Sequence, residues 1–386
     1  MYTLMLENIP VANFDFDELS SHIINKHLLP FYLRGSLEEP NAENIRDYYK
    51  VSSKNVSLIR EYASSRVLSL SRDNAKQIYA ACGISQDDSI ENRVAICLAC
   101  KGVSVNDGYW IKEESSSDTW ESVNVRDNHL AEIVDIALGG KQPTLTTSTK
   151  CPELTTKGLF KKSWIREDRE LYLLKSDRMS DFANTKAELL SSKILDCTNI
   201  PHVKYTESSY EGMIVAKSKN FVLSGQSFVE AHEIIKYCKD TKTDYVSCML
   251  DCFGSSFANI AIIDYILQNT DRHDQNYGFI MDNKTGVLNS VAPLFDHNQA
   301  LIADWLGKDV TDTLSQMIPD GKTIQERASM MESYADISFD IEKWETLKAS
   351  IPEQAELFKN IEKRIDQFSC IKKIENEKEL NDYEDR

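Results

Sequence analysis

Strand-like alternation of apolar and polar residues opens the chain, and helix-like patterns follow it. Residues 1–6 are mostly apolar, and residues 11–14 alternate apolar and polar side chains, which is typical of strands. Apolar residues then recur three and four positions apart, which predicts short amphipathic helices at residues 41–50, 57–68, 71–82, 88–101 and 129–137. A turn followed by a short strand is predicted at residues 104–112. We therefore expect a mainly helical amino-terminal region over residues 1–138.

A change of pattern after residue 138 marks a second part of the chain. Residues 139–150 are rich in Gly, Pro, Ser and Thr and have no apolar period, so we expect a linker there. The segments that follow predict two strands around a glycine turn in 154–165, a strand at 170–175, a helix at 184–197, and extended segments near 202–206 and 212–216. This order predicts a small, strand-rich lobe over residues 151–235.

The carboxy-terminal part becomes helical from residue 243. Its first helix has one apolar face that runs directly into Asn269, formed by Phe253, Phe257, Ile260, Ile263 and Leu267. Two strands joined by a turn are predicted within residues 277–295, and helices are predicted from residue 311 to about residue 373. We expect a helical large lobe over residues 236–374 and a charged, disordered tail over residues 375–386. The whole chain is then α+β with two lobes.

Composition and charge narrow the class of protein. The 386 residues are 41% hydrophobic and 27% charged, which is typical of a globular protein with room for two or three domains. The net charge of -17 argues against direct binding of nucleic acid. No apolar run approaches about 18 residues and no secretion signal is evident, so we expect a cytoplasmic protein without membrane contact. The nine scattered cysteines are expected to be reduced thiols.

Three polar residues near the hairpin predicted within residues 277–295 have the spacing that protein kinases use for phosphoryl transfer. Asp271 and Asn276 lie five residues apart after the apolar helix, and Asp296 follows the predicted hairpin. Phosphoryl transfer needs a carboxylate near the attacking hydroxyl and oxygen ligands that hold Mg²⁺ against the phosphates. We assign the first role to Asp271 and the second to Asn276 and Asp296. The alternative is that these polar residues only cap a helix and start a turn.

Lys175, at the end of a predicted strand, is the candidate for contacting nucleotide phosphates. Glu188 on the following helix is its candidate partner, because a helix carboxylate can steady such a lysine. Before that strand, Thr156, Lys157 and Gly158 are candidate phosphate contacts in a turn with one glycine, where phosphate-binding loops normally have several. The positive charge of Lys157, Lys161 and Lys162 could compensate for the missing glycines. A solvated hairpin tip is the alternative.

Two further residues are candidates for support of the loop at Asp271. His273 could hydrogen-bond Asp271 or the backbone, and we favour this structural role while keeping His273 as a catalytic candidate. Asp264, two helical turns earlier, could brace the loop from below or be an ordinary exposed residue.

The motif Asp-Arg-His-Asp-Gln-Asn at residues 271–276 resembles the Asp-x-His-x-x-Asn catalytic loop of the HipA-like serine/threonine kinases. These bacterial proteins have a kinase-like fold with two lobes, and the resemblance covers roughly residues 150–370. It implies Asp271 as catalytic base, Asn276 and Asp296 as magnesium ligands, and Lys175 as the ATP lysine. ATP and Mg²⁺ are therefore the expected cofactors.

The resemblance also implies regulation. The segments 107–110 and 159–164 look like members with an extended amino-terminal region. Some members are toxins held in check by a DNA-binding antitoxin and silenced by phosphorylation of their own phosphate loop. Here Thr155, Thr156 and Ser163 are the hydroxyls that could be phosphorylated. A regulatory partner such as an antitoxin would bind through residues 1–138.

Three hypotheses for function follow from the sequence. The first is an ATP- and Mg-dependent kinase that acts on Ser or Thr of a protein. The second is a kinase of a small molecule or lipid, because related folds serve these acceptors too and fold alone does not choose between them. The third is a non-catalytic pseudokinase whose amino-terminal region recruits a partner.

Overall fold

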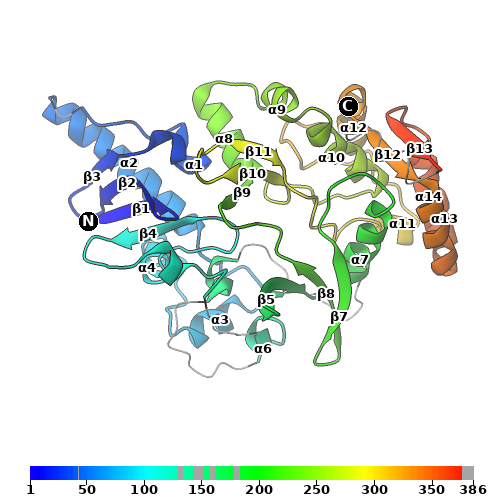
Figure 1. The fold of residues 1–386 in the computed structure, drawn as a ribbon, viewed down its shortest axis with the longest axis horizontal. Coiled ribbons are helices and arrows are strands. Elements are labelled where there is room, and N and C mark those ends of the chain that lie inside the picture. The colour runs from blue at the N-terminus through cyan, green and yellow to red at the C-terminus, as the bar shows by residue number, and fades with distance from the viewer. Residues whose placement is uncertain (42, 129–133, 142–150, 157–160, 178–182, 376–386) are drawn as a thin grey trace.

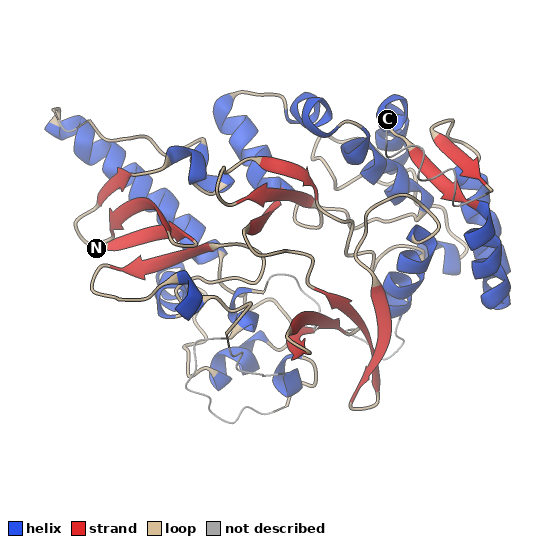
Figure 2. Cartoon of the chain, in the orientation of Figure 1, coloured by secondary structure: helices blue, strands red, loops and turns tan. Residues whose placement is uncertain are grey.

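The computed structural model describes the whole chain except residues 42, 129–133, 142–150, 157–160, 178–182 and 376–386 (Figure 1). Most of the predicted linker and nearly all of the predicted tail lie outside the described residues. Lys157 and Gly158 also lie outside them. The strands of the described residues form four separate sheets, with helices packed around them (Figure 2).

A four-stranded antiparallel sheet organises the amino-terminal region. Its strands lie in the order β3-β2-β1-β4 and are β1 (Tyr2–Leu6), β2 (Ile9–Asp15), β3 (Ser20–Ile23) and β4 (Tyr109–Glu113). The prediction that residues 1–138 are mainly helical is therefore wrong. The sheet is completed by β4, which pairs with β1 from about one hundred residues away in sequence. A pattern read within short windows does not display such a pairing.

The helices α2 (Ile45–Ser65), α3 (Ala75–Ala81), α4 (Ile90–Ala99) and α6 (Val134–Ala137) lie close to predicted positions. The short helices η1 (Lys26–Leu28), α1 (Phe31–Arg34) and α5 (Trp120–Val123) were not predicted. Helix α2 joins two predicted segments into one helix of 21 residues, since neither Gly nor Pro interrupts it. Asn44 caps its first turn by accepting a hydrogen bond from the Asp47 N–H, which replaces one missing helical partner.

The small lobe is a second antiparallel sheet, in the order β5-β6-β8-β7. Its strands are β5 (Lys162–Glu167), β6 (Glu170–Lys175), β7 (Tyr205–Tyr210) and β8 (Met213–Lys219), and helix α7 (Ala183–Leu195) packs against it. The strand predicted at residue 154 is wrong, because Pro152–Thr155 form a 3₁₀ helix, η2. Pro152 stands at its first position, where a missing N–H costs no hydrogen bond.

The large lobe combines helices with a third sheet, β11-β10-β9. Strands β9 (Gln226–Glu230), β10 (Gly278–Asp282) and β11 (Leu288–Val291) form it. The helices are α8 (Ala231–Thr241), α9 (Tyr245–Phe253), α10 (Ser255–Ile266), α11 (Ile302–Trp305), α12 (Ile324–Met331), η3 (Glu332–Tyr334), α13 (Ile341–Ser350), η4 (Pro352–Gln354) and α14 (Ala355–Ile365). The predicted lobe boundary at residues 235 and 236 falls inside α8.

One segment of the large lobe differs from its prediction. Residues 311–373 are not wholly helical, because β12 (Ile337–Asp340) and β13 (Ile371–Ile374) form a parallel pair. The connection between the two strands runs through α13 and α14, as parallel pairing requires a long crossover. Strands of four residues are too short for a clear period of their own.

Helix α10 is the centre of the core. Every residue from Phe257 to Ile266 is buried, so the helix is surrounded by protein on all sides. In the part of the chain that the structure describes, no single helix is long and apolar enough to cross a membrane. Helices α9 and α10 meet that test only as a pair, and a bend of 111° separates them. The cluster of buried apolar residues around α10 extends from Leu4 to Phe368, so the amino-terminal region and the large lobe share one core.

A buried ion pair closes the end of α2. The Arg66 guanidinium donates to both Asp107 carboxylate oxygens at 3.0 and 2.9 Å. It also donates to the Gly102 carbonyl at 2.8 Å, the Tyr62 hydroxyl at 2.9 Å and the Tyr109 carbonyl at 3.1 Å. These bonds involve all three guanidinium nitrogens of Arg66, which ties α2 to the loop before β4.

We expect Asp107→Asn to destabilise the fold by roughly 3–5 kcal/mol, because it leaves the Arg66 charge buried without its partner. Asp118→Asn is the matched control, since Asp118 pairs with Lys101 at 2.6 Å while both side chains are about one third exposed. Its cost should not exceed about 1 kcal/mol. Denaturant unfolding of the full chain measures both values. Equal losses in the two variants would show that the Arg66 pair does not stabilise the amino-terminal region in this way.

Candidate active site

The segment that carries Asp271 is a tight loop between the core helix and β10. Its first residue, Asn269, donates from its backbone N–H to the Asp264 carbonyl at 2.8 Å and from its side chain to the Asp264 carboxylate at 3.0 Å. The loop then runs to Asn276 and enters β10 at Gly278. A rigid, buried helix on one side and a strand on the other fix both ends of the loop.

Arg272 and Asp264 form the internal brace of this loop. The Arg272 Nε donates to both Asp264 carboxylate oxygens at 3.1 Å, and only 1% of Arg272 is exposed. Asp264 is also buried, so the interpretation that it supports the loop is correct and the exposed alternative is wrong. Burial raises the pKa of Asp264, although Arg272 acts in the opposite direction. Removing either partner would leave a buried charge without compensation.

The motif residues Asp271, His273 and Asn276 make their hydrogen bonds within this loop. The Asn276 side-chain amide donates to the Asp271 carbonyl at 2.8 Å, which leaves the Asn276 Oδ1 as the atom able to face a cation. The His273 Nδ1 accepts the Gln275 backbone N–H at 3.2 Å. His273 therefore contacts the loop backbone, which was one of the two contacts expected for it. Burial raises the pKa of Asp271, with His273 opposing and Asp296 adding to the rise.

Asp296 is brought to the same loop by the hairpin β10–β11. The second Arg272 nitrogen, Nη1, donates to the Asn276 carbonyl at 2.7 Å and to the Phe295 carbonyl at 2.6 Å, so one guanidinium joins the two segments. The Phe295 ring packs against Phe228 with ring centroids 5.5 Å apart. The backbone φ of Asp296 is +59°, a left-handed conformation that Asp tolerates better than most residues. Such conformations are frequent at functional sites.

Lys175 connects the small lobe to Asp296. Its Nζ donates to the Glu188 carboxylate at 2.8 Å, the Asp296 carboxylate at 2.9 Å and the Tyr205 hydroxyl at 3.3 Å. The pairing predicted between Lys175 and Glu188 is thus present. The three polar partners come from α7, from the segment after β11 and from β7. The Lys175 ammonium group therefore contacts residues of both lobes.

The charges of this cluster shift each other's pKa strongly. Burial acts to lower the pKa of Lys175, but Asp296 and Glu188 outweigh it, so the pKa is raised and Lys175 stays charged. Burial raises the pKa of Glu188, with Lys175 in opposition. Burial also acts to raise the pKa of Asp296, but Lys175 and Lys162 hold it well below its usual value. Asp296 is therefore an ionised carboxylate, as a metal ligand must be.

Lys162 is a second lysine directed at the same cluster. It lies opposite Lys175 in the β5–β6 pairing and is buried. Burial lowers the pKa of Lys162 to about 8, while the nearby Asp296 acts to raise it. From the sequence, Lys162 was expected only to add positive charge to the turn. Lys162 lies near Asp296 because it pairs with Lys175 across β5 and β6, and the sequence alone does not reveal this strand register.

The residues present suit a hard divalent cation. Asn276 and Asp296 offer neutral and charged oxygen, the ligand types that Mg²⁺ prefers. Among the described residues, no group of three or more His, Cys, Asp or Glu is close enough to hold a metal alone. A cation here would therefore share its coordination with phosphate oxygens and water, as Mg²⁺ does in kinase sites.

Two polar atoms next to Asp296 also point to a site that takes a ligand. The Asn298 side-chain amide donates to Asp296 at 3.0 Å, but its Oδ1 is buried and has no hydrogen-bond partner in the described part of the chain. The same holds for the buried His297 Nε2. Burial lowers the pKa of His297 well below its usual value, with Arg272 adding to this, so His297 is neutral. Most buried polar atoms in folded proteins have a hydrogen-bond partner, so two such atoms beside Asp296 leave room for a water, an ion or a ligand group to supply one.

The candidate hydroxyls of the turn before β5 are buried in this conformation. The Thr156 hydroxyl donates to the Pro152 carbonyl at 2.7 Å, and the Ser163 hydroxyl donates to the Glu153 carboxylate at 2.8 Å. Thr155 is also buried, with its hydroxyl 3.3 Å from the same Pro152 carbonyl. Phosphorylation of any of the three therefore requires the segment to leave this arrangement.

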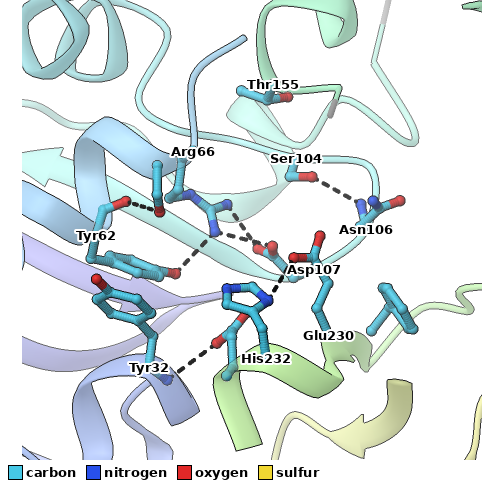
Figure 3. Close-up of a pocket in the computed structure, with 12 residues that line it drawn as sticks. Tyr32, Tyr62, Arg66, Ser104, Asn106, Asp107, Thr155, Glu230 and His232 are labelled. Atoms are coloured by element: carbon cyan, nitrogen blue, oxygen red, sulfur yellow. Dashed lines mark hydrogen bonds and ion pairs between the residues drawn. The ribbon is translucent and has the colours of Figure 1, made fainter. Parts of the chain in front are cut away.

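A polar pocket lies where the amino-terminal region meets α8 (Figure 3). Arg66 and Asp107 pair on one side of it, and His232 lies 3.0 Å from the Glu230 carboxylate on the other. The Glu233 carboxylate accepts the Tyr32 backbone N–H at 3.2 Å. These polar groups contact each other, so we interpret the pocket as part of the junction between the two regions.

Two solved structures resemble this chain. One is HipA of Shewanella oneidensis MR-1, from a complex of its toxin–antitoxin system with HipB and operator DNA, with a TM-score of 0.54 and 9% identity over 95% of this chain and 97% of that one. The other is the proinflammatory kinase CtkA of Helicobacter pylori, with a TM-score of 0.41 and 15% identity over 55% of this chain and 90% of that one. The first match confirms a HipA-like kinase fold. No match is found among the curated proteins.

A family model locates the kinase part of the chain. Residues 174–370 match the model of phosphatidylinositol 3- and 4-kinase. The match begins one residue before Lys175 and includes Glu188, Asp271, Asn276 and Asp296. Because the match spans half of the chain, the chain belongs to the phosphatidylinositol 3- and 4-kinase family.

Proposed function

We propose that this protein is a phosphotransferase that uses ATP and Mg²⁺. The observation that carries the proposal is the contact of one buried ammonium, Lys175, with both Glu188 and Asp296. Kinases require a lysine that pairs with a helix carboxylate next to the metal-binding Asp. A lysine left in solvent at the end of a strand would have neither this contact nor this burial.

The residues of the site divide the work of phosphoryl transfer between them. Lys175 and Lys162 would contact the nucleotide phosphates, and Asn276 and Asp296 would hold Mg²⁺, which would supply charge neutralisation for the phosphates. Asp271 orients the attacking hydroxyl and accepts its proton. Burial raises the pKa of Asp271, which makes it a stronger base than an exposed carboxylate. His273 holds the loop by accepting the Gln275 N–H.

We propose the hydroxyl of a protein Ser or Thr as the acceptor. The support for this choice is the HipA-like fold together with the Asp-x-His-x-x-Asn loop at residues 271–276. By the same likeness, the amino-terminal region is the proposed contact for a regulatory partner such as an antitoxin. Thr155, Thr156 and Ser163 remain the candidates for self-phosphorylation, and mass mapping after incubation with Mg-ATP tests them.

A second acceptor class has its own support. The family to which the chain belongs is described by its phosphatidylinositol kinases, which favours a lipid or small-molecule alcohol. A screen of protein, lipid and small-molecule acceptors with labelled ATP separates the two classes. Transfer confined to a non-protein acceptor would replace the protein-kinase proposal.

Asp271→Asn and Asp296→Asn should each abolish phosphate transfer, because one loses the base and the other a charged metal ligand. Each variant keeps the shape of the side chain, but Asp296→Asn also removes one carboxylate partner of the buried Lys175. A thermal unfolding scan therefore checks that each variant is folded at the assay temperature. Asp251→Asn, on the exposed side of α9, is the matched control and should keep full activity. Incorporation of labelled phosphate measures all three. Normal incorporation by either site variant would refute the assignment of that residue.

Mg-ATP should stabilise the folded protein by about 2.7 kcal/mol at a hundredfold excess over its dissociation constant. A thermal unfolding scan with and without Mg-ATP measures this, and chelation of the metal should remove most of the stabilisation. If saturating Mg-ATP leaves the unfolding transition unchanged, the non-catalytic binding module becomes the better interpretation.

The value of kcat/KM for Mg-ATP should fall as the pH rises through about 8. Burial lowers the pKa of Lys162 to about 8 from an ordinary value of 10.5, so its charge, present at neutral pH, is lost in this range. The profile of kcat/KM reports groups of the free enzyme. Lys162→Arg keeps the charge at all these pH values, so the fall should move to higher pH. Superimposable profiles of the two proteins would exclude Lys162 as a phosphate contact.

A further inference from the structure

Arg72 links the amino-terminal region to the segment that leads into β5. It lies between α2 and α3, and only 3% of it is exposed. Its Nη1 donates to the Thr156 carbonyl at 3.0 Å, and its Nη2 donates to the Lys162 carbonyl. One guanidinium therefore holds the end of η2 and the first residue of β5 together.

The arginine has no carboxylate as a direct partner at these two contacts. Burial lowers the pKa of Arg72 to about 10, with Glu153 acting in the opposite direction. An apolar side chain of similar size would avoid this cost of burying a charge. What it would not supply is a planar group with several donors in fixed directions. The contacts of Arg72 are therefore best explained by the geometry that they impose on the two carbonyls.

The segment around Arg72 is itself fixed to η2. The Leu68 N–H donates to the Leu154 carbonyl at 2.7 Å, and the Tyr79 hydroxyl donates to the Leu68 carbonyl. On the other side of η2, the fully buried Glu153 carboxylate accepts from the Trp164 N–H at 2.9 Å. Arg72 thus belongs to a segment that is fixed in place, and it holds the start of β5 against that segment.

The residue that Arg72 holds is part of the phosphate-transfer cluster. Lys162 is paired with Lys175 across β5 and β6, and Asp296 affects the pKa of both lysines. The Ser176 N–H donates to the Lys161 carbonyl at 3.0 Å, which continues the same ladder. A shift of the Lys162 backbone would therefore move its ammonium relative to Lys175 and Asp296.

We propose that Arg72 is a positioning residue of the nucleotide site: it sets Lys162 for contact with the nucleotide phosphates, so the amino-terminal region is a working part of that site. The proposal rests on the proposed phosphotransferase function. It also gives a route for regulation, because a partner that displaces residues 68–75 would weaken nucleotide binding without touching the catalytic loop.

The test compares Arg72→Met and Arg72→Lys in the full chain. Met matches the length of the side chain without donors, and we expect it to raise the KM for Mg-ATP about tenfold or more with a smaller change in kcat. Lys can keep one carbonyl contact but not the planar pair, so Arg72→Lys should recover part of the loss. Arg60→Met is the matched control, because Arg60 also donates to a backbone carbonyl, Phe16 at 3.0 Å, within the amino-terminal region.

Two results would overturn the proposal. The first is a KM for Mg-ATP in Arg72→Met equal to that of the unaltered chain. The second is an equal rise of KM in Arg60→Met, which would show only a general loss of stability. Amide hydrogen exchange at Trp164 supplies a readout that needs no activity. Faster exchange in Arg72→Met, with normal exchange in Arg60→Met, supports the positioning role even if the unaltered chain transfers no phosphate, and unchanged exchange contradicts it.

Discussion

The buried ammonium of Lys175 is the interaction on which the rest of the site depends. It holds Glu188 from α7 and Asp296 from the segment after β11, so it joins the small lobe to the large one. Glu188 is fully buried, so without this charge it would carry a desolvation penalty, and Asp296 would lose its direct ion-pair partner. The positions of the two carboxylates therefore depend on the same ammonium group. The ion pair between Lys175 and Asp296 thus stabilises the present arrangement of the two lobes.

Arg272 is a second buried charge that holds two segments of the site together. Arg272 is held by Asp264 and uses Nη1 to fix the carbonyls of Asn276 and Phe295. The loop of residues 269–276 and the segment that carries Asp296 are therefore held in register through backbone atoms, so Arg272 occupies none of the side chains of Asp271, Asn276 and Asp296. Arg72 follows the same principle in the small lobe, where it fixes the backbone of Lys162. In each case a guanidinium fixes backbone carbonyls, and the candidate functional side chains belong to neighbouring residues.

The sequence predicted the parts of this site that are local. The spacing of Asp271 and Asn276 after an apolar helix, and of Lys175 before the helix with Glu188, is legible because each pair lies within a few turns or strands. The amino-terminal sheet was missed because β4 pairs with β1 over a long separation, and the pair β12–β13 because each strand is very short. The contributions of Lys162 and Arg72 depend on register and burial, which no local pattern contains. The sequence shows a lysine at 162 and an arginine at 72, but it does not show which residues they contact in the fold.

Charge balance explains why such a site would take a metal with its nucleotide. Glu188, Asp271 and Asp296 bring three carboxylates, against which stand Lys175 and Lys162, since Arg272 is paired with Asp264. The polyphosphate of a nucleotide would add several negative charges to a cluster that already has more carboxylates than lysines. Repulsion of that size in a buried site is not compensated by two lysines alone. A divalent cation held by Asp296 and Asn276 would reduce this repulsion, so under the proposed function the nucleotide would bind together with Mg²⁺ rather than alone.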